Sequence, residues 1–302
     1  MEGIVICSTG RWCDVYSEGN LYKCSLKGNL RLKGLKTTNP VAVGDRVLFE
    51  ADEKNASGRV YEILDRKNVL IRRATNLSRQ THILAANVDL AVVIATPVLP
   101  RTSTGFIDRF LITAEAYNIP VLIVFNKMDL FEQEMSIVDY YNEIYQGAGY
   151  STMTVSSTKG TNTEDFRKII SGKTILLTGH SGVGKSTLIK ALAPDLKIKI
   201  GNISEAHLKG THTTTFARMY MLPDDTLIID TPGIKEFGVV DFVPWELGHW
   251  FREFKEYIPQ CRYANCTHQH EPGCAVREAA EAGKIHEERY SNYLGILNNI
   301  ST

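Results

Sequence analysis

Residues 174–187 read TILLTGHSGVGKST, and this stretch decides the fold of the middle of the chain. An apolar run with strand character precedes a glycine-rich turn, and the residues after it, LIKALA, have helical spacing. The turn satisfies the pattern G-x-x-x-x-G-K-[ST] between a strand and a helix, the context in which that pattern forms a phosphate-binding loop. We expect the amides of the loop and the start of the helix to attract phosphate oxygens.

The predicted phosphate-binding residues are those of the loop and the first helical turn, namely Gly179, His180, Ser181, Gly182, Val183, Gly184, Lys185, Ser186 and Thr187. Lys185 is the expected catalytic cation, since it should reach the β- and γ-phosphates, and Ser186 is the expected ligand of Mg²⁺. A glycine-rich turn that binds no ligand is the alternative, and the flanking strand and helix argue against it.

A second motif follows the apolar strand 226–230, where the sequence reads DTPG from Asp230 to Gly233. Open α/β sheets bind ligands at the carboxyl ends of their strands, so Asp230 is placed to hold Mg²⁺ through water. The amide of Gly233 is placed to sense a γ-phosphate. Alone this would be a common turn sequence; beside a phosphate-binding loop it indicates a nucleotide hydrolase.

The choice of base is predicted by VLIVFNKMD, which ends at Asp129. A carboxylate accepts hydrogen bonds from both N1–H and the 2-amino group of guanine, whereas adenine has an acceptor at N1 and no such amine. This selects GTP and GDP over ATP. A second loop, VSSTKG at 155–160, should complete the base site. The predicted base-site residues are Asn126, Lys127, Met128, Asp129, Ser156 and Ser157.

The order of these motifs is unusual. NKMD and SSTKG precede the phosphate loop, the polar loop GTHTTTF and DTPG, whereas a common GTPase begins with the phosphate loop. We therefore predict a circularly permuted GTPase, which is possible because the termini of a compact domain often lie close together. The chain leaves this domain directly after DTPG, and we hypothesise that residues 234–245 transmit the γ-phosphate state to the C-terminal domain.

The loop GTHTTTF at 210–216 occupies the position of switch I. One of Thr213, Thr214 and Thr215 should complete the Mg²⁺ shell; we place Thr214 in the predicted site, although the sequence does not decide among the three. Ile234 follows DTPG where many GTPases have a water-orienting glutamine, so intrinsic hydrolysis should be slow. His212 is the candidate catalytic residue for orienting the water, and contact with a partner is its alternative role.

The remaining sequence predicts a multidomain chain. Residues 1–72 contain short strands separated by polar turns and fit an all-β OB-type barrel that binds RNA. Residues 73–239 alternate apolar strands with helices, as in an α/β P-loop domain with a mostly parallel sheet. Residues 240–302 are mostly helical and surround a cysteine-rich segment.

The cysteine-rich segment reads CRYANCTHQHEPGC from Cys261 to Cys274. Three thiolates and one imidazole, from Cys261, Cys266, His268 and Cys274, fit a closed structural Zn²⁺ site. His270 is the rival nitrogen ligand, and loose thiols are the alternative to a metal. The three other cysteines lack neighbouring histidines and are expected as core or free thiols: Cys7, Cys13 and Cys24.

Composition limits the function classes. Among 302 residues, 34 basic side chains balance 34 acidic ones, which excludes a uniformly basic nucleic-acid coat protein. Basic residues are concentrated in 23–36 and 66–80, and they either bind RNA or are merely solvated. No apolar run approaches the ~20 residues of a membrane span, and no signal peptide is recognisable, so we expect a cytoplasmic protein without a membrane partner.

Taken together, the barrel, the permuted motifs and the Cys-x4-Cys-x-His-x5-Cys segment resemble the RsgA (YjeQ/YloQ) family of small ribosomal subunit biogenesis GTPases. The resemblance implies a GTP hydrolase that binds the small subunit and its rRNA through the flanking domains, assists late maturation, and uses Mg²⁺ with GTP and one structural Zn²⁺. A monomer is expected. The alternatives are a soluble signalling GTPase without a ribosomal partner and a zinc-dependent nucleic-acid-binding module with a vestigial GTPase domain.

Overall fold

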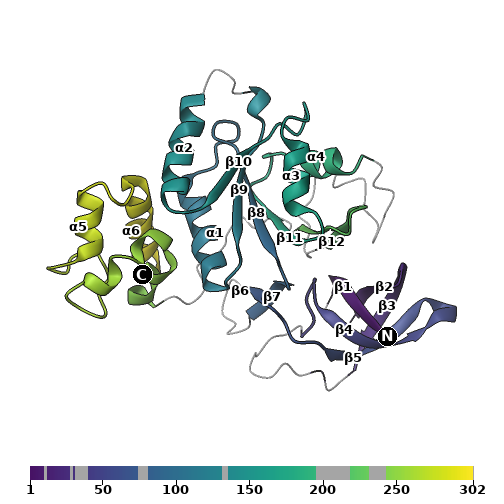
Figure 1. The fold of residues 1–302 in the computed structure, drawn as a ribbon. Helices are drawn as coiled ribbons and strands as arrows, with labels where there is room; N and C mark the ends of the chain where they lie inside the picture. The colour runs from purple at the N-terminus through teal and green to yellow at the C-terminus, as the bar shows by residue number, and fades with distance from the viewer. Residues whose placement is uncertain are drawn as a thin grey trace.

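Strands β1 to β5 form a closed barrel at one end of the molecule (Figure 1). Closure follows from the pairing of β1 with both β2 and β4 and from the parallel pairing of β3 with β5. Alternate residues of each strand face the interior, as in β2, where Cys13 and Val15 are buried. The strands are β1 (Glu2–Ser8), β2 (Trp12–Ser17), β3 (Asn20–Leu26), β4 (Arg46–Asp52) and β5 (Ser57–Ile63). The predicted OB-type barrel is confirmed.

The computed structural model describes residues 1–9, 12–27, 30, 40–73, 81–130, 135–194, 218–230 and 243–301. After the barrel, β6 (Val69–Arg73) and β7 (Thr81–Ala86) pair as a separate two-stranded antiparallel sheet. The predicted domain boundary at 72/73 falls within β6, and the boundary at 239/240 lies outside the described residues. The domain limits therefore stay predictions.

The central sheet has the strand order β10-β9-β8-β11-β13-β12, and all its pairings are parallel except that of β12 with β13. Its inner strands β9, β8, β11 and β13 are largely apolar because both faces are covered. The strands are β8 (Leu90–Ala95), β9 (Val121–Phe125), β10 (Ser151–Thr154), β11 (Thr174–Thr178), β12 (Arg218–Met221) and β13 (Leu227–Asp230). The predicted α/β domain is confirmed.

Two helices cover each face of the central sheet (Figure 1). One hydrophobic cluster packs α1 (Thr104–Ala116) and α2 (Met135–Gly147) against the sheet, and a second packs α3 (Thr163–Ile170) and α4 (Lys185–Leu192) against the other face. Helix α1 begins where it does because the Ser103 hydroxyl accepts a hydrogen bond from the Phe106 amide as an N-cap. The carboxyl ends of the parallel strands consequently open on one edge, where the sequence motifs lie.

The barrel continues into the central sheet along β1 and β12. Cys7 of β1 is the backbone partner of Arg218 in β12, antiparallel. Ile6 of the barrel lies in the same hydrophobic cluster as Met219 of β12. Since β12 pairs in turn with β13, the barrel is joined through one strand to the strand that ends at Asp230.

A buried ion pair lies close to this junction. Arg66 donates to both carboxylate oxygens of Asp45 at 2.6 Å, and the side chain of Asp45 is fully buried. Gly44 (φ +91°) precedes it, and a Cβ there would lie 2.1 Å from the carbonyl oxygen of Ala86, so only glycine allows this approach of barrel and β7. Arg66 belongs to the basic cluster 66–80, but its guanidinium pairs with a buried carboxylate instead of facing solvent.

The C-terminal region packs around its own hydrophobic cluster, which also includes Ile112 of α1. The sequence WELGHWFREFKEYI forms short 3-10 turns instead of one helix, because these turns bring Leu247, Phe251 and Phe254 into the same core. The elements are η3 (Pro244–Trp250), η4 (Arg252–Phe254), η5 (Ile258–Gln260), α5 (Ala275–Glu281) and α6 (Glu287–Ser301). Among the described residues, no helix combines the length and apolar character needed to cross a bilayer.

Candidate nucleotide and metal sites

The phosphate loop, residues 179–184, connects β11 to α4 as predicted. Gly184 has φ +96°, and a Cβ there would lie 2.3 Å from the side-chain nitrogen of Asn126, so the base motif and the loop are in close contact. Ser186 and Thr187 are exposed on the first turn of α4. The structure thus brings the sequence-predicted phosphate residues together.

Lys185 is the first residue of α4, and its side chain reaches back to the phosphate loop. Its ammonium donates hydrogen bonds to the carbonyl oxygens of Gly179 at 2.5 Å and His180 at 2.8 Å. An ammonium has three protons, so one donor remains for a phosphate oxygen. Burial lowers the pKa of Lys185, and the nearby charge of Asp230 opposes this by favouring the cation.

Asp230 ends β13, and its backbone partner in the neighbouring parallel strand β11 is Leu177. The carboxylate therefore lies beside the strand that leads into the phosphate loop, close enough for its charge to act on Lys185. This is the location expected for a residue that holds Mg²⁺ next to bound phosphates. The prediction of its place in the fold is correct; its metal contact stays a prediction.

Asn126 joins the base motif to the two neighbouring loops. Its buried amide donates to the carbonyl of Val183 at 2.8 Å, and its oxygen accepts from the amide and hydroxyl of Ser157 at 3.2 and 2.8 Å. The predicted contact of Asn126 with the base is not tested by this arrangement. What the structure adds is that Asn126 fixes the distance between the base site and the phosphate loop.

Asp129 is held by two hydroxyl groups. Ser156 donates to one carboxylate oxygen at 2.5 Å and Thr158 to the other at 3.0 Å. The bond from Ser156 is the main reason that the pKa of Asp129 is lowered. Thr158 was not among the predicted site residues, although it stands in the same SSTKG loop; its hydroxyl next to two serines was the available signal.

The loop between β8 and α1 also adjoins the site, which the sequence did not indicate. Lys127 donates to the carbonyl of Leu99 at 3.1 Å, and Pro100 lies beside Gly182 of the phosphate loop.

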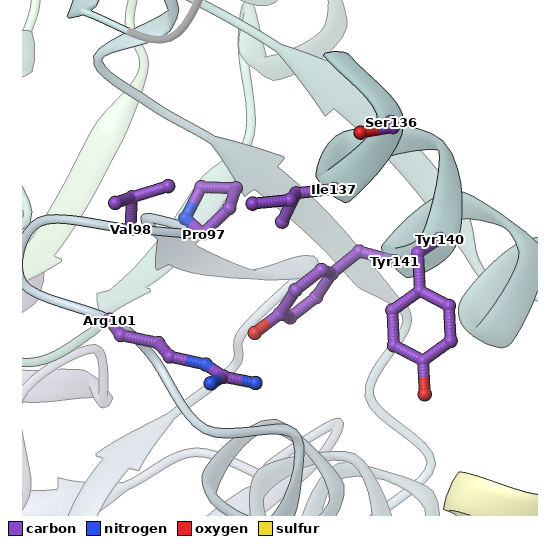
Figure 2. Close-up of a pocket in the computed structure, with 7 residues that line it drawn as sticks. All are labelled: Pro97, Val98, Arg101, Ser136, Ile137, Tyr140 and Tyr141. Carbon is purple, nitrogen blue, oxygen red and sulfur yellow. The ribbon is translucent and has the colours of Figure 1, made fainter. Parts of the chain in front are cut away.

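A pocket of about 340 Å³ lies between the β8–α1 loop and α2 (Figure 2). Its lining, which includes Arg101 and Tyr141, contains none of the predicted nucleotide residues.

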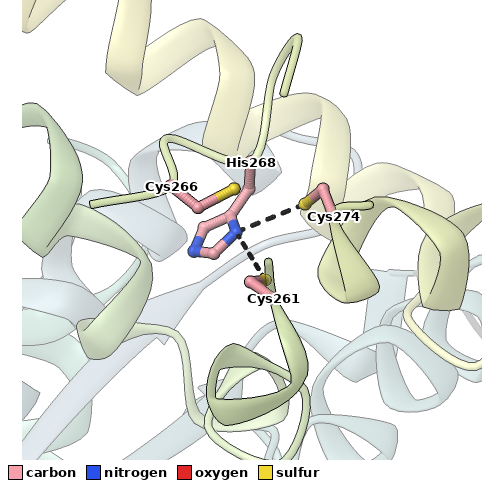
Figure 3. A group of neighbouring side chains, drawn as sticks. All are labelled: Cys261, Cys266, His268 and Cys274. Carbon is pink, nitrogen blue, oxygen red and sulfur yellow. Dashed lines mark hydrogen bonds between the residues drawn. The ribbon is translucent and has the colours of Figure 1, made fainter. Parts of the chain in front are cut away.

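The four predicted metal ligands meet in the C-terminal region (Figure 3). Their ligand atoms all lie within 4.8 Å of one another, and Nδ1 of His268 is 3.6 Å from the sulfur of Cys261 and 3.4 Å from that of Cys274. Cys266 completes the cluster, whereas His270 is exposed and outside it. The cluster can hold a metal ion, and His268 is its nitrogen donor.

The surroundings of the cluster suit a metal site. Burial lowers the pKa of His268 to about 4, so its imidazole is neutral and able to ligate at pH 7. The carboxylate of Glu271 accepts hydrogen bonds from the amides of Thr267, Gln269 and His270 and so fixes the turn that carries His268.

The N-terminal cysteines lie in the barrel, away from this cluster. Two of them, Cys13 and Cys24, are buried in the barrel core, as predicted.

Comparison with known proteins identifies the family of the chain. The family model described as RsgA GTPase matches residues 63–240, and the RsgA N-terminal domain model matches residues 2–58. The chain belongs to the RsgA GTPase family. The family resemblance seen in the sequence is therefore confirmed.

Full-length relatives of the RsgA family support this. The chain is 50% identical over 299 residues to small ribosomal subunit biogenesis GTPase RsgA 2 of Bacteroides thetaiotaomicron, covering 98% of this chain and 96% of the relative. Among solved structures, YjeQ from Thermotoga maritima matches with a TM-score of 0.78 and 34% identity over 99% and 97% of the two chains. YloQ, titled a circularly permuted GTPase, matches with a TM-score of 0.74 and 29% identity over 99% and 94%.

Several residues predicted to form the nucleotide site lie outside the part of the chain that the structure describes. These are the switch residues His212, Thr213, Thr214 and Thr215, the DTPG amide of Gly233, and Ile234. Most of the predicted transmitting segment 234–245 also lies outside them. The roles assigned to these residues stay predictions.

Proposed function

We propose that this RsgA-family chain hydrolyses GTP when it is docked on the small ribosomal subunit and thereby assists late maturation of that subunit. The observation that carries the proposal is the combination of Asp129, ionised and held by two hydroxyls, with a phosphate loop bound by Lys185 in one permuted domain. The relatives named above are small ribosomal subunit biogenesis GTPases, which supports the same partner for this chain. A cytoplasmic location follows from that partner, and we expect a monomer.

The chemistry assigned to the nucleotide site needs Mg²⁺, which neutralises charge on the β- and γ-phosphates. Ser186, Asp230 and one switch threonine would hold the ion, and Lys185 would stabilise the charge that develops in the transition state. His212 would orient the attacking water. Because Ile234 cannot hydrogen-bond, we expect hydrolysis to be slow until the subunit completes the site.

We assign the metal of the Cys3His cluster as Zn²⁺ with a structural role. Three thiolates and a neutral imidazole are the donor set of closed tetrahedral zinc sites. The cluster is mostly buried, and Tyr290 and Tyr293 donate to the carbonyls of His268 and Thr267 at 2.7 Å, which ties α6 to the metal-binding turn. Loss of the ion should therefore loosen the packing of α6.

The barrel and the metal-binding turn each offer an exposed surface for RNA. Trp12 is 50% exposed on β2, and the strand registers place Ser25 and then Arg59 in line with it across the barrel. On the metal-binding turn, the guanidinium of Arg262 lies over the ring of exposed Tyr263 at 5.6 Å. Aromatic rings stack on bases, and arginine contacts phosphates, so both pairs suit rRNA.

GTP hydrolysis measured with and without purified small subunits, across a salt series, tests the proposal. We expect strong stimulation by the subunit that weakens steeply as salt rises, because phosphate contacts release counterions. Trp12→Ala should reduce stimulation without changing intrinsic hydrolysis, and Leu21→Ala, an exposed apolar residue on the adjacent strand, is its control. Absence of stimulation at every salt concentration would favour the signalling GTPase instead.

A further inference from the structure

His180 makes two contacts that connect the phosphate loop with a neighbouring helix. Its carbonyl oxygen accepts a hydrogen bond from Lys185 at 2.8 Å. Its imidazole packs against the ring of Phe106 in α1, with ring centroids 3.9 Å apart and planes inclined by 34°. Burial, together with the charges of Lys185 and Arg109, lowers the pKa of His180, so the ring that stacks is neutral.

The helix that His180 contacts is also the helix that holds the C-terminal domain. Thr104 donates to Glu288 of α6, and Asn292 of α6 donates to Asp108 at 2.7 Å. Asp108 also pairs with Arg289, and both side chains are fully buried. Thr104 and Asp108, four positions apart, share the face of α1 that meets α6, whereas Phe106 points from the opposite face toward His180.

Between Thr104 and Asp108, helix α6 packs directly against α1. A Cβ built at Gly105 would lie 3.4 Å from the side-chain oxygen of Asn292. Phe106 itself is 3% exposed, so the ring has packed neighbours on all sides. Close-packed interiors transmit small displacements, since they contain little free space to absorb them.

The ammonium of Lys185 completes the connection. It holds the carbonyls of Gly179 and His180 with two of its donors, and its third donor is available to a phosphate oxygen. A pull on this ammonium by bound phosphates therefore acts on the His180 peptide, and through its ring on Phe106. The route runs entirely through described residues and is separate from the segment after DTPG.

We propose that His180 is a positioning residue that couples the nucleotide site to the interface between α1 and α6, and so to the metal-binding domain. This rests on the guanine-nucleotide binding proposed above. By linkage, a change at the α1–α6 interface must then alter nucleotide affinity, although no α6 residue is placed in the nucleotide site. The ratio of GTP to GDP affinity changes with it because the γ-phosphate adds to the pull on Lys185.

A double-mutant cycle tests the coupling. The affinities for GDP and for a non-hydrolysable GTP analogue are measured by fluorescence titration in the full chain, in His180→Ala, in Asn292→Ala and in the double variant. Asn292→Ala should change the ratio of the two affinities by about threefold or more in the parent chain and not in the His180→Ala background. His180→Phe, which keeps a ring on Phe106, should restore the effect.

The controls separate the possible failures. Asn299→Ala changes the same residue type at an exposed position of α6 and should leave the affinity ratio unchanged. If His180→Ala is insoluble, Phe106→Leu removes the other ring of the stack and should give the same loss. An equal effect of Asn292→Ala with and without His180, or no effect in the parent chain, would overturn the proposal. Failure of the parent chain to bind either nucleotide would instead refute the proposed function.

Discussion

The side-chain amide of Asn126 donates a hydrogen bond to the backbone carbonyl of Val183 at 2.8 Å, and so joins the base motif to the phosphate loop. The same side chain accepts two hydrogen bonds from Ser157. One residue therefore sets the spacing of three loops that are far apart in the sequence. A nucleotide can bind its base and phosphates together only if that spacing is correct.

We expect Asn126→Ala to weaken GDP binding at least about tenfold, because each buried polar group left unpaired costs about 1–3 kcal/mol. Titration with a fluorescent GDP analogue measures this. Asn299→Ala, at an exposed position of α6, is the matched control and should bind GDP normally. Unchanged affinity in Asn126→Ala would show that the loops keep their spacing without it.

The base preference should change with a single substitution at Asp129. Asn in its place offers an amide donor, which suits the 2-oxo group of xanthine and cannot accept from both guanine donors. Asp129→Asn should therefore lose GTP hydrolysis and gain hydrolysis of XTP. Asp165→Asn, on the exposed surface of α3, should leave GTP specificity intact. Retained GTP preference in Asp129→Asn would contradict the assigned base site.

The two neighbouring histidines of the metal-binding turn provide a test of the ligand set. His268→Ala removes a buried donor of the cluster, so we expect loss of bound zinc and a lower unfolding temperature of the C-terminal region. His270→Ala should retain about one zinc per chain, because His270 is outside the cluster. Metal analysis of both purified variants measures the difference, and equal zinc contents would refute the assignment.

The sequence predicted the nucleotide motifs because each follows an apolar strand, and the carboxyl ends of parallel strands meet at one edge of the sheet. Asp230 and the phosphate loop are brought together in this way by the pairing of β13 with β11. The Cys3His cluster was predictable because fourteen consecutive residues carry its four members, so local geometry suffices. These are features that short-range patterns determine.

The remaining contacts depend on long-range packing, which one sequence does not reveal. Arg289 and Asp108 are 181 positions apart, and nothing in either segment indicates that they pair. The same holds for Arg66: the sequence places it in a basic cluster, and nothing there indicates that it pairs with Asp45. Charge patterns give the number of ionic groups but not their partners.

Arg66 should therefore act on stability more than on RNA binding. Arg66→Ala leaves the carboxylate of Asp45 buried without its cation, which typically costs about 3–5 kcal/mol of unfolding free energy. Lys67→Ala removes an exposed pair with Asp89 and should cost at most about 1 kcal/mol. Urea unfolding of the two variants measures this contrast; equal effects would mean that Arg66 is not needed at the junction.

The pH dependence of stability should reveal the buried carboxyl of Asp108. Burial raises its pKa from 3.8 to about 6, although Arg289 and Asn292 oppose the shift. The folded chain therefore binds more protons than the unfolded chain between about pH 4 and pH 6, so this group's stabilising contribution is fully present below about pH 4 and is lost as the pH rises through 6.

Asp108→Asn removes the titrating group and keeps one acceptor oxygen for Arg289, while its new amide NH2 can donate to the side-chain oxygen of Asn292 if that amide turns over. The unfolding free energy of the parent chain minus that of Asp108→Asn should be larger at pH 4.5 than at pH 7. Urea midpoints measured for both chains across this range give the comparison, with Asp165→Asn as the control for an exposed carboxyl. A constant difference between parent and Asp108→Asn at all pH values would mean that Asp108 stays ionised at the interface. In that case the attraction of Arg289 would outweigh the burial of the carboxylate.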